Sequence, residues 1–246
     1  MKQNKFERDL AIVNSILDKD PYEVTHDEAL TLIGILQVSY HDSGKIEGIF
    51  SIDSSAHGCH FCEKMRKASE EDPSIICGKC YDYKQECYRA NVLQRHQLNL
   101  RILSSVLFAD DEIATLPAGQ IVRINSSGDI ENLTHARNII RYTKTHAYTH
   151  VAVWSKNFAV MKQAFQIEGK PKNLTYIASS YRIDEQMCLP AYADYMFTVY
   201  SDEAKLHAAL DSGACECNGK KCKDCGFKCY LHTWAQWTNI AELLRK

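Results

Sequence analysis

The sequence predicts an α/β protein, either a partial (β/α) barrel or an open, mainly parallel sheet of about five strands. From residue 45 onward, short runs rich in valine, isoleucine, tyrosine and phenylalanine alternate with longer helical patterns, which is typical of βαβ units. A polar turn that contains serine follows each run, as expected at the carboxyl end of a parallel strand. The predicted strands lie within residues 45–53, 120–125, 148–154, 174–178 and 194–200.

Helices are predicted before and between these strands. Apolar residues recur at helical spacing from Phe6 to Leu17, and a second helix begins at Thr25 and Glu28, which have the spacing of a capping box. The helices between and after the strands are expected within residues 83–108, 130–146, 157–168 and 201–213.

We expect three parts along the chain. Residues 1–44 form a helical cap, and residues 45–211 form the α/β core with a first group of cysteines. Residues 212–246 form a cysteine-rich metal loop followed by a C-terminal helix. No linker rich in proline, glycine or serine separates these parts.

Composition excludes some classes of protein. The formal net charge of −2 gives no overall field that would recruit nucleic acid or an anionic membrane. No apolar run approaches the roughly 20 residues that span a bilayer, and the first residues interleave charged and apolar side chains, unlike a secretory signal. The sequence therefore predicts a cytoplasmic protein without a membrane partner.

Eleven cysteines, ten of them in two groups, are the most informative feature. Cytoplasmic thiols stay reduced, so clustered cysteines there bind metal more often than they form disulfides. The remaining cysteine, Cys188, is expected to be a small buried apolar residue.

The first cysteine group directly follows the first predicted strand, so we expect it at the edge where the strands end. Two C-x2-C pairs separated by fourteen residues suit tetrahedral zinc, and four thiolates also hold an iron–sulfur cluster. His57, His60 and Cys87 are spare candidates that are more typical of surface groups. The expected ligands are Cys59, Cys62, Cys77 and Cys80.

The second group has the compact step C-x2-C-x3-C, which is seen in cluster-binding loops. Several lysines surround it, and these would lower thiolate pKa values and offset the charge of a cluster. A solvated basic loop around structural zinc is the alternative. The expected ligands are Cys222, Cys225 and Cys229, completed by Cys215 or Cys217.

The polar turns supply the other candidate residues. Asp129 would bind a hydroxyl group or act as a base, and Lys156 and Arg182 would hold an anionic group such as phosphate or carboxylate. Ser126 and Ser127 would bind a cofactor. The alternative for such residues is structural, because serine and aspartate also cap helices and close turns.

Three segments resemble the phage gene product 88 domain family. They are the Cys-Tyr segment with its long helix (77–103), the strand, Ser-Gly-Asp turn, helix and strand (122–157), and the closing cysteine loop (222–230). The resemblance covers roughly residues 45–230. The sequence departs from the family pattern at its final C-x3-C-Tyr, where the family tends to have C-x2-C and Trp.

The resemblance implies a phage or mobile-element protein in the cytoplasm of a bacterial host. It further implies a partial barrel like that of radical S-adenosylmethionine enzymes and an iron–sulfur cluster, most often of the 4Fe-4S type. S-adenosylmethionine itself has no motif here: the C-x3-C-x2-C triplet and the glycine-rich strand end are both missing.

Three functions are considered. The first is an iron–sulfur enzyme that acts on a small-molecule or nucleotide-like substrate at the mouth of the barrel. The second is a non-catalytic zinc module whose lysine-rich cysteine loop binds nucleic acid or a protein, with Phe227 stacking on a base. A phage protein that blocks or diverts a host complex is a third.

Overall fold

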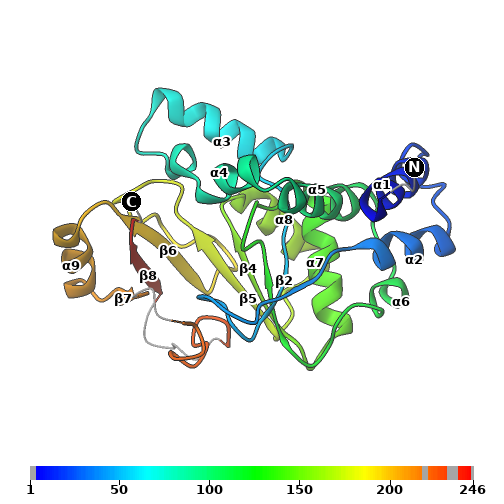
Figure 1. Cartoon of the computed structure of the whole chain (residues 1–246). Coiled ribbons are helices and arrows are strands. Elements are labelled where there is room, and N and C mark those ends of the chain that lie inside the picture. The colour runs from blue at the N-terminus through cyan, green and yellow to red at the C-terminus, as the bar shows by residue number, and fades with distance from the viewer. Residues whose placement is uncertain (1–3, 218–220, 232–237, 245–246) are drawn as a thin grey trace.

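The computed structural model describes residues 4–217, 221–231 and 238–244, which form one open sheet of eight strands with helices packed on it (Figure 1). The strand order is β1-β2-β3-β4-β5-β6-β8-β7, and only β1 runs antiparallel to its neighbour. The strands are β1 Ser39–Tyr40, β2 Phe50–Ile52, β3 Ile121–Ile124, β4 His150–Ser155, β5 Leu174–Ser179, β6 Tyr195–Tyr200, β7 Cys215–Glu216 and β8 Asn239–Leu243. The predicted fold class is confirmed.

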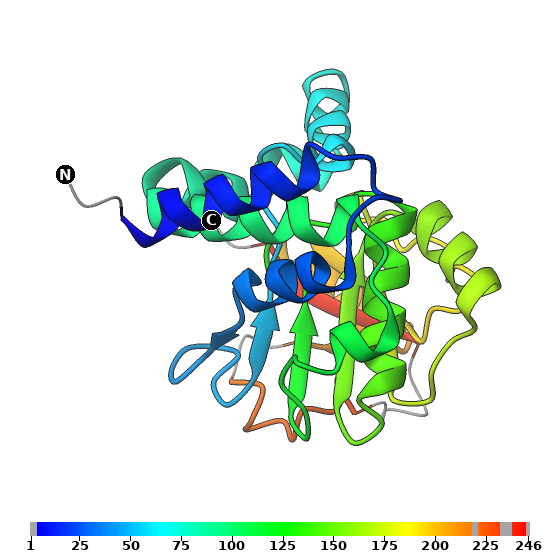
Figure 2. The same ribbon diagram turned by 90° about the vertical axis from the view of Figure 1, so that its right-hand side faces the viewer.

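Most of the helices cover one face of the sheet, here called the outer face. Figure 2 shows this layer, in which α1, α2, α5 and α7 lie on the same side of the strands. The predicted capping box of Thr25 and Glu28 begins α2. The helices are α1 Lys5–Leu17, α2 His26–Ile35, α3 His60–Glu71, α4 Tyr81–Tyr88, α5 Ala90–Ser105, α6 Asp110–Ile113, α7 Leu133–Thr145, α8 Phe158–Glu168 and α9 Glu203–Asp211, with a 3-10 turn η1 at Ile76–Lys79.

The five predicted strands correspond to β2 through β6, and three further strands extend the sheet. The predicted C-terminal helix is wrong where the structure describes it, because Asn239–Leu243 is strand β8. This strand pairs with all five residues from Met196 to Tyr200 of β6. Tertiary pairing here outweighs the local preference of the Ala-Glu-Leu-Leu segment for a helix.

The long helix predicted for residues 83–108 is two helices. Arg89 lies between α4 and α5 with a non-helical backbone, φ −125° and ψ 80°. A further helix, α3, fills the gap between the two C-x2-C pairs, and Cys59 is its N-cap residue. The first cysteine group is therefore built on helix ends as well as on loops.

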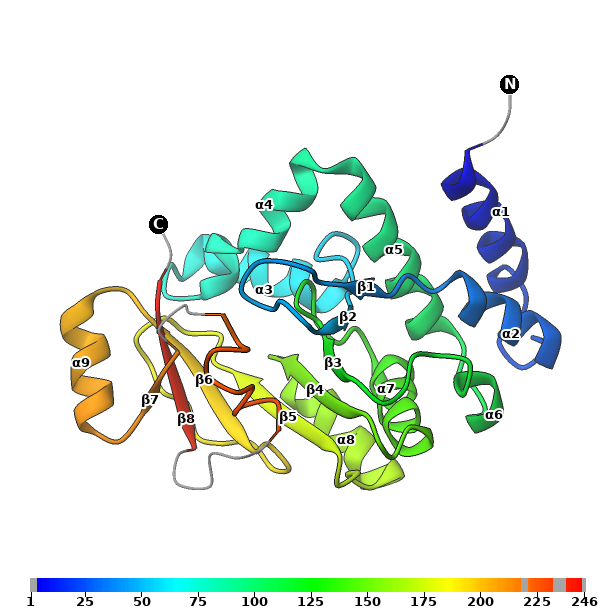
Figure 3. The same ribbon diagram turned by 60° about the horizontal axis from the view of Figure 1, so that its bottom comes forward.

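Alternation along the strands divides the interior into two cores. Val122, Val151 and Val153 point to the outer face and pack under the helices. Ala152 and Ile177 point to the other, inner face, which is covered by residues 221–231 rather than by a helix. Figure 3 shows this segment, in orange, lying across the inner face of the sheet. All residues of β5 are buried because both faces of that strand are covered.

None of the helices within the described ranges is long and apolar enough to cross a membrane.

Candidate functional site

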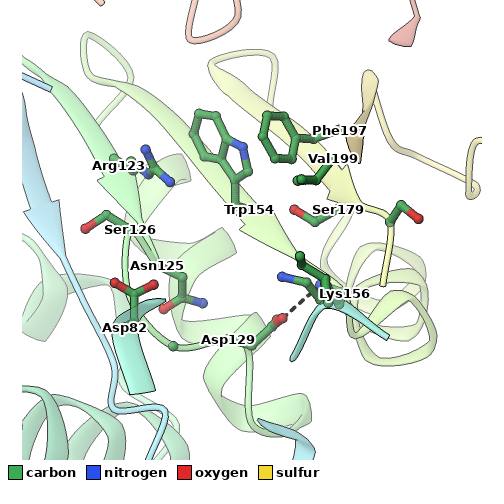
Figure 4. A pocket seen from close by; sticks show the side chains of 13 residues that line it. Asp82, Arg123, Asn125, Ser126, Asp129, Trp154, Lys156, Ser179, Phe197 and Val199 are labelled. Carbon is green, nitrogen blue, oxygen red and sulfur yellow. Dashed lines mark hydrogen bonds between the residues drawn. The ribbon is translucent and has the colours of Figure 1, made fainter. Parts of the chain in front are cut away.

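The carboxyl ends of β3 to β6 surround a cavity of about 150 Å³ on the inner side of the sheet (Figure 4). Parallel pairing places the turns that follow these strands at one edge, as predicted. A second cavity of about 70 Å³ shares Asp82, Gly128, Asp129 and Lys156 with the first and is also lined by cysteines. The two cavities form the candidate site.

Asp53, which follows β2, fixes the Ser-Ser-Gly-Asp turn after β3. Its Oδ1 accepts the backbone N–H groups of Ser126 and Ser127 at 2.7 Å and 3.1 Å. The turn then passes close to the neighbouring chain: a Cβ on Gly128 would lie 2.3 Å from the backbone oxygen of Ser54, and Gly128 has a φ of +75°. Only glycine fits this position without strain.

The two predicted cofactor-binding serines are used within the protein. The Ser126 hydroxyl donates to Asp53 and faces the larger cavity. The Ser127 hydroxyl is buried and donates to Glu86 Oε1 at 3.5 Å. Ser126 is therefore placed to contact a ligand, whereas Ser127 supports the turn.

Asp129 lies at the junction of the two cavities. Its carboxylate accepts the Ser155 hydroxyl at 2.6 Å and the backbone N–H groups of Ile130 at 2.7 Å and Lys156 at 2.9 Å. Burial raises the pKa of Asp129, although Lys156 and these donors oppose the rise. The carboxylate is thus held firmly in place by three donors.

Lys156 follows β4 and lines both cavities. Burial alone would lower its pKa, but electrostatic interactions with Cys77, Asp129 and Cys80 raise it above the ordinary value. Lys156 is therefore the cation between the cysteines and the strand-end cavity.

Arg182 does not reach either cavity. Its Nη1 lies 2.9 Å from Asp72 Oδ2 and donates to the Ser74 hydroxyl, also at 2.9 Å. A β-bridge between Ile75 and Arg182 strengthens the same contact. The predicted role of Arg182 in holding a substrate anion is therefore not supported by its position, because the side chain clamps the segment after α3 to the turn after β5.

Arg123, which the sequence did not single out, supplies the cation instead. It lies within β3 and points to the inner face, with its guanidinium 4.2 Å from the ring centroid of Trp154. Its Nη1 donates to the Tyr230 hydroxyl at 3.4 Å. The signal was present in the sequence, since an arginine between Val122 and Ile124 interrupts a strand that is otherwise apolar.

Asp82 in α4 contributes a second carboxylate to both cavities. Burial raises the pKa of Asp82 to about 6, and the nearby charge of Asp53 acts in the same direction. Nothing in the sequence distinguishes this residue from Glu86, the other acidic residue of α4.

Three of the four cysteines of the first group, Cys62, Cys77 and Cys80, line the smaller cavity. Cys59 is fully buried beside them, and its sulfur accepts the N–H of Cys62 at 3.4 Å. Cys80 is the N-cap of α4, and its sulfur accepts the N–H of Tyr83 at 3.4 Å.

Three thiols of this group have raised pKa values. The hydrogen bond from Cys59 and burial raise the pKa of Cys62 well above its ordinary value, and burial raises the pKa of Cys77 and Cys80. All are free cysteines. Across the described ranges, no three His, Cys, Asp or Glu side chains converge closely enough to hold a metal ion.

The spare candidates near this group have other partners. His60 pairs with Glu131, and His57 stacks on Tyr83 with ring centroids 3.7 Å apart. Cys87 is exposed, with its sulfur 3.5 Å from Nε2 of His57.

The second cysteine group lies on the inner face, toward the amino ends of the strands. The Cys222 N–H donates to the backbone oxygen of Lys45 at 2.7 Å, and the Thr175 hydroxyl donates to the backbone oxygen of Tyr230 at 2.9 Å. Burial and the neighbouring thiols raise the pKa of Cys229 to about 12. Cys215, Cys217, Cys222 and Cys229 belong to the inner-face apolar cluster, and Cys225 is half-buried beside them.

The two groups are therefore separate. Figure 1 shows α3 and the orange loop of residues 221–231 at opposite ends of the strands. Cys188 belongs to neither group and is exposed, so the expectation that it is buried is wrong.

In the lysine-rich cysteine loop, Lys221 and Lys223 pair with Glu47. Phe227 packs edge-on against Tyr230 with ring centroids 6.2 Å apart. Lys220 lies outside the described residues.

Comparison with known proteins identifies the family of this chain. The family model of gene product 88 matches residues 29–239. The chain belongs to the gene product 88 family. The family match runs from α2 to the first residue of β8 and so includes both cysteine groups and the lining of both cavities. No curated protein and no solved structure matches the chain.

Proposed function

We propose that this gene product 88 protein binds an iron–sulfur cluster through Cys59, Cys62, Cys77 and Cys80, and that it is an enzyme acting on a small molecule in the adjoining cavity. One observation carries the proposal: three thiols of this group share a cavity with Asp129 and Lys156, which also line the larger cavity at the strand ends. A group bound by the cysteines would therefore adjoin a ligand bound at the strand ends.

The chemistry of the donor set suits such a cluster, and the sulfurs would have to draw together to bind it, since no three metal-binding side chains of the described residues converge closely enough. Four thiolates are the usual ligands of a cubane cluster, and these four thiols are free and lie around one cavity or directly beside it. Backbone N–H groups already point at the sulfurs of Cys59 and Cys80, as they do at metal-bound thiolates. When bound by four thiolates, the cluster would supply electron transfer.

Binding would release the thiol protons, since only thiolates coordinate metal. Lys156 lies beside these cysteines and would offset part of the negative charge of a cluster held by four thiolates. Asp129 is fixed by its three donors and would orient a hydroxyl or amine of the substrate.

The second cysteine group is proposed as a separate metal site with a structural role. Burial and the nearby thiols of Cys217 and Cys225 raise the pKa values of Cys222 and Cys229, and Cys215 lies beside them on β7. A metal there would hold the loop that covers the inner face. Ten clustered thiols also suit the reducing cytoplasm of a bacterial host.

The test is to isolate the protein without oxygen and to measure iron, acid-labile sulfide and zinc. We expect iron and sulfide in equal amounts, and the Cys59→Ser and Cys80→Ser variants should each lose one cluster's worth of both. Cys188→Ser, at an exposed cysteine outside both groups, is the matched control and should keep the wild-type content. Stoichiometric zinc without iron would reject the cluster and favour a non-catalytic zinc module.

A further inference from the structure

Arg123 carries a charge inside the protein for which the described residues supply no ion-pair partner. Its Nε–H is buried without a hydrogen-bond partner, and its Nη1 reaches only the neutral hydroxyl of Tyr230. Asp53 attracts it from beyond ion-pair distance, because the Asp53 carboxylate is bound to the Ser-Ser turn. The ring of Trp154 stabilises this charge in part, and the unpaired Nε–H leaves the guanidinium able to bind an anion.

The surroundings of Arg123 give the shape of that anion. The guanidinium is stacked over Trp154 of β4, and Phe197 of β6 lines the same cavity. Figure 4 shows these side chains at one end of the cavity, with Ser179 beside them. A guanidinium with free N–H groups binds the paired oxygens of a carboxylate or phosphate, and the aromatic rings contact a flat or apolar group.

We propose that Arg123 anchors an oxyanion group, a carboxylate or a phosphate, of a small molecule that occupies this cavity. The flat or apolar part of that molecule lies against Trp154 and Phe197. This inference deepens the proposed function, since it gives the chemical class of the ligand bound beside the cysteines.

The opposite end of the cavity restricts the rest of the ligand. Asp82 and Asp129 both line it there, in Figure 4 below Arg123 and Trp154. Lys156 lies beside Asp129 at this end and offsets part of the charge of the two carboxylates, whose oxygens accept hydrogen bonds from hydroxyl or amine groups. The ligand therefore carries an oxyanion at Arg123 and hydrogen-bond donors at its other end.

The test uses the whole chain and two probes, benzoate and inorganic phosphate, with binding measured by calorimetry. Wild-type protein should bind at least one probe, and Arg123→Gln should weaken that binding by about tenfold or more, the size expected for a lost charge-assisted pair. Arg95→Gln is the matched control, because Arg95 is exposed and donates only to Ser39; it should bind as wild type does. Tighter binding of benzoate identifies a carboxylate ligand, and tighter binding of phosphate identifies a phosphorylated one.

Should Arg123→Gln fail to fold, Arg123→Lys decides the matter. Lysine keeps the charge but lacks the planar fork, so it should bind benzoate about threefold to tenfold more weakly. Unchanged affinity in the folded variant would overturn the proposal, as would a wild-type protein that binds neither probe at about 10 mM. These readouts do not require iron, so a failure here is distinguishable from a failure of the cluster proposal, which is read from metal content.

Discussion

The carboxylate of Glu86 and the imidazole of His96 are hydrogen-bonded inside the protein, with Oε1 and Nδ1 2.8 Å apart. The other Glu86 oxygen accepts the Ser55 hydroxyl at 2.9 Å and the Ala56 N–H at 3.1 Å. Glu86 is only 1% exposed. This carboxylate therefore ties the α4–α5 pair to the loop that leads from β2 to Cys59.

Replacing Glu86 by glutamine should destabilise the protein by about 3 kcal/mol, because His96 loses its charged partner and the loop loses a charged acceptor. Urea unfolding measures the effect. Glu70→Gln is the control: Glu70 pairs with Arg66 on the exposed surface of α3, where such a pair contributes less than about 0.5 kcal/mol. Equal losses in the two variants would show that the Glu86 network does not stabilise the fold.

Alanine at Gly128 should destabilise the protein by about 2 kcal/mol or more, because the new Cβ would meet the Ser54 backbone in a left-handed conformation. Thermal unfolding measures the loss. The same change at Gly34 in α2 is the control, since nothing lies within 4 Å of a Cβ there. Gly34→Ala should instead stabilise the helix by about 0.5–1 kcal/mol.

Acid should weaken the fold through His135. Burial lowers the pKa of His135 to about 4, whereas an unfolded histidine titrates near 6.5. Between these values the unfolded chain binds a proton that the native state does not, so stability falls as the pH drops from about 6.5 to 4. The full difference is roughly 3 kcal/mol.

The change His135→Asn removes this pH-dependent contribution to the free energy of unfolding. It keeps an acceptor for the Glu131 N–H, which donates to Nδ1 of His135 in the wild type. The free energy of unfolding of the variant should therefore fall less steeply with decreasing pH than that of the wild type. His150→Gln, at an exposed side chain, should keep the wild-type slope. Parallel slopes for His135→Asn and the wild type would contradict the prediction.

Loss of a thiol should have different results in the two cysteine groups. Cys225→Ser should remove one site's worth of metal and loosen the loop over the inner face while the sheet stays folded. Cys59→Ser should remove metal from the strand-end site and reduce probe binding with a smaller loss of stability. Metal analysis together with thermal unfolding separates the two. If every variant loses the same metal in the same proportion, the groups form one shared site.

The sequence was sufficient to predict the fold where the hydrophobic pattern and the tertiary packing favour the same element. Alternation located β2 to β6, and parallel order then placed Asp129 and Lys156 at one edge with the cysteines. Prediction from the sequence failed where the position of a side chain depends on partners that are distant in the chain. Arg182 is held by Asp72, which lies 110 residues earlier, and Arg123 gains its position from Tyr230, 107 residues later.

Strand order also determines when the inner face can be closed. Among the described strands, β7 pairs only with β8, and β8 lies between β7 and β6. During synthesis, β8 is the last of these strands to leave the ribosome, so Cys215 and Cys217 have no place in the sheet until it arrives. The part of the inner face that lies beside β7 is therefore completed last, when β8 pairs with both β6 and β7.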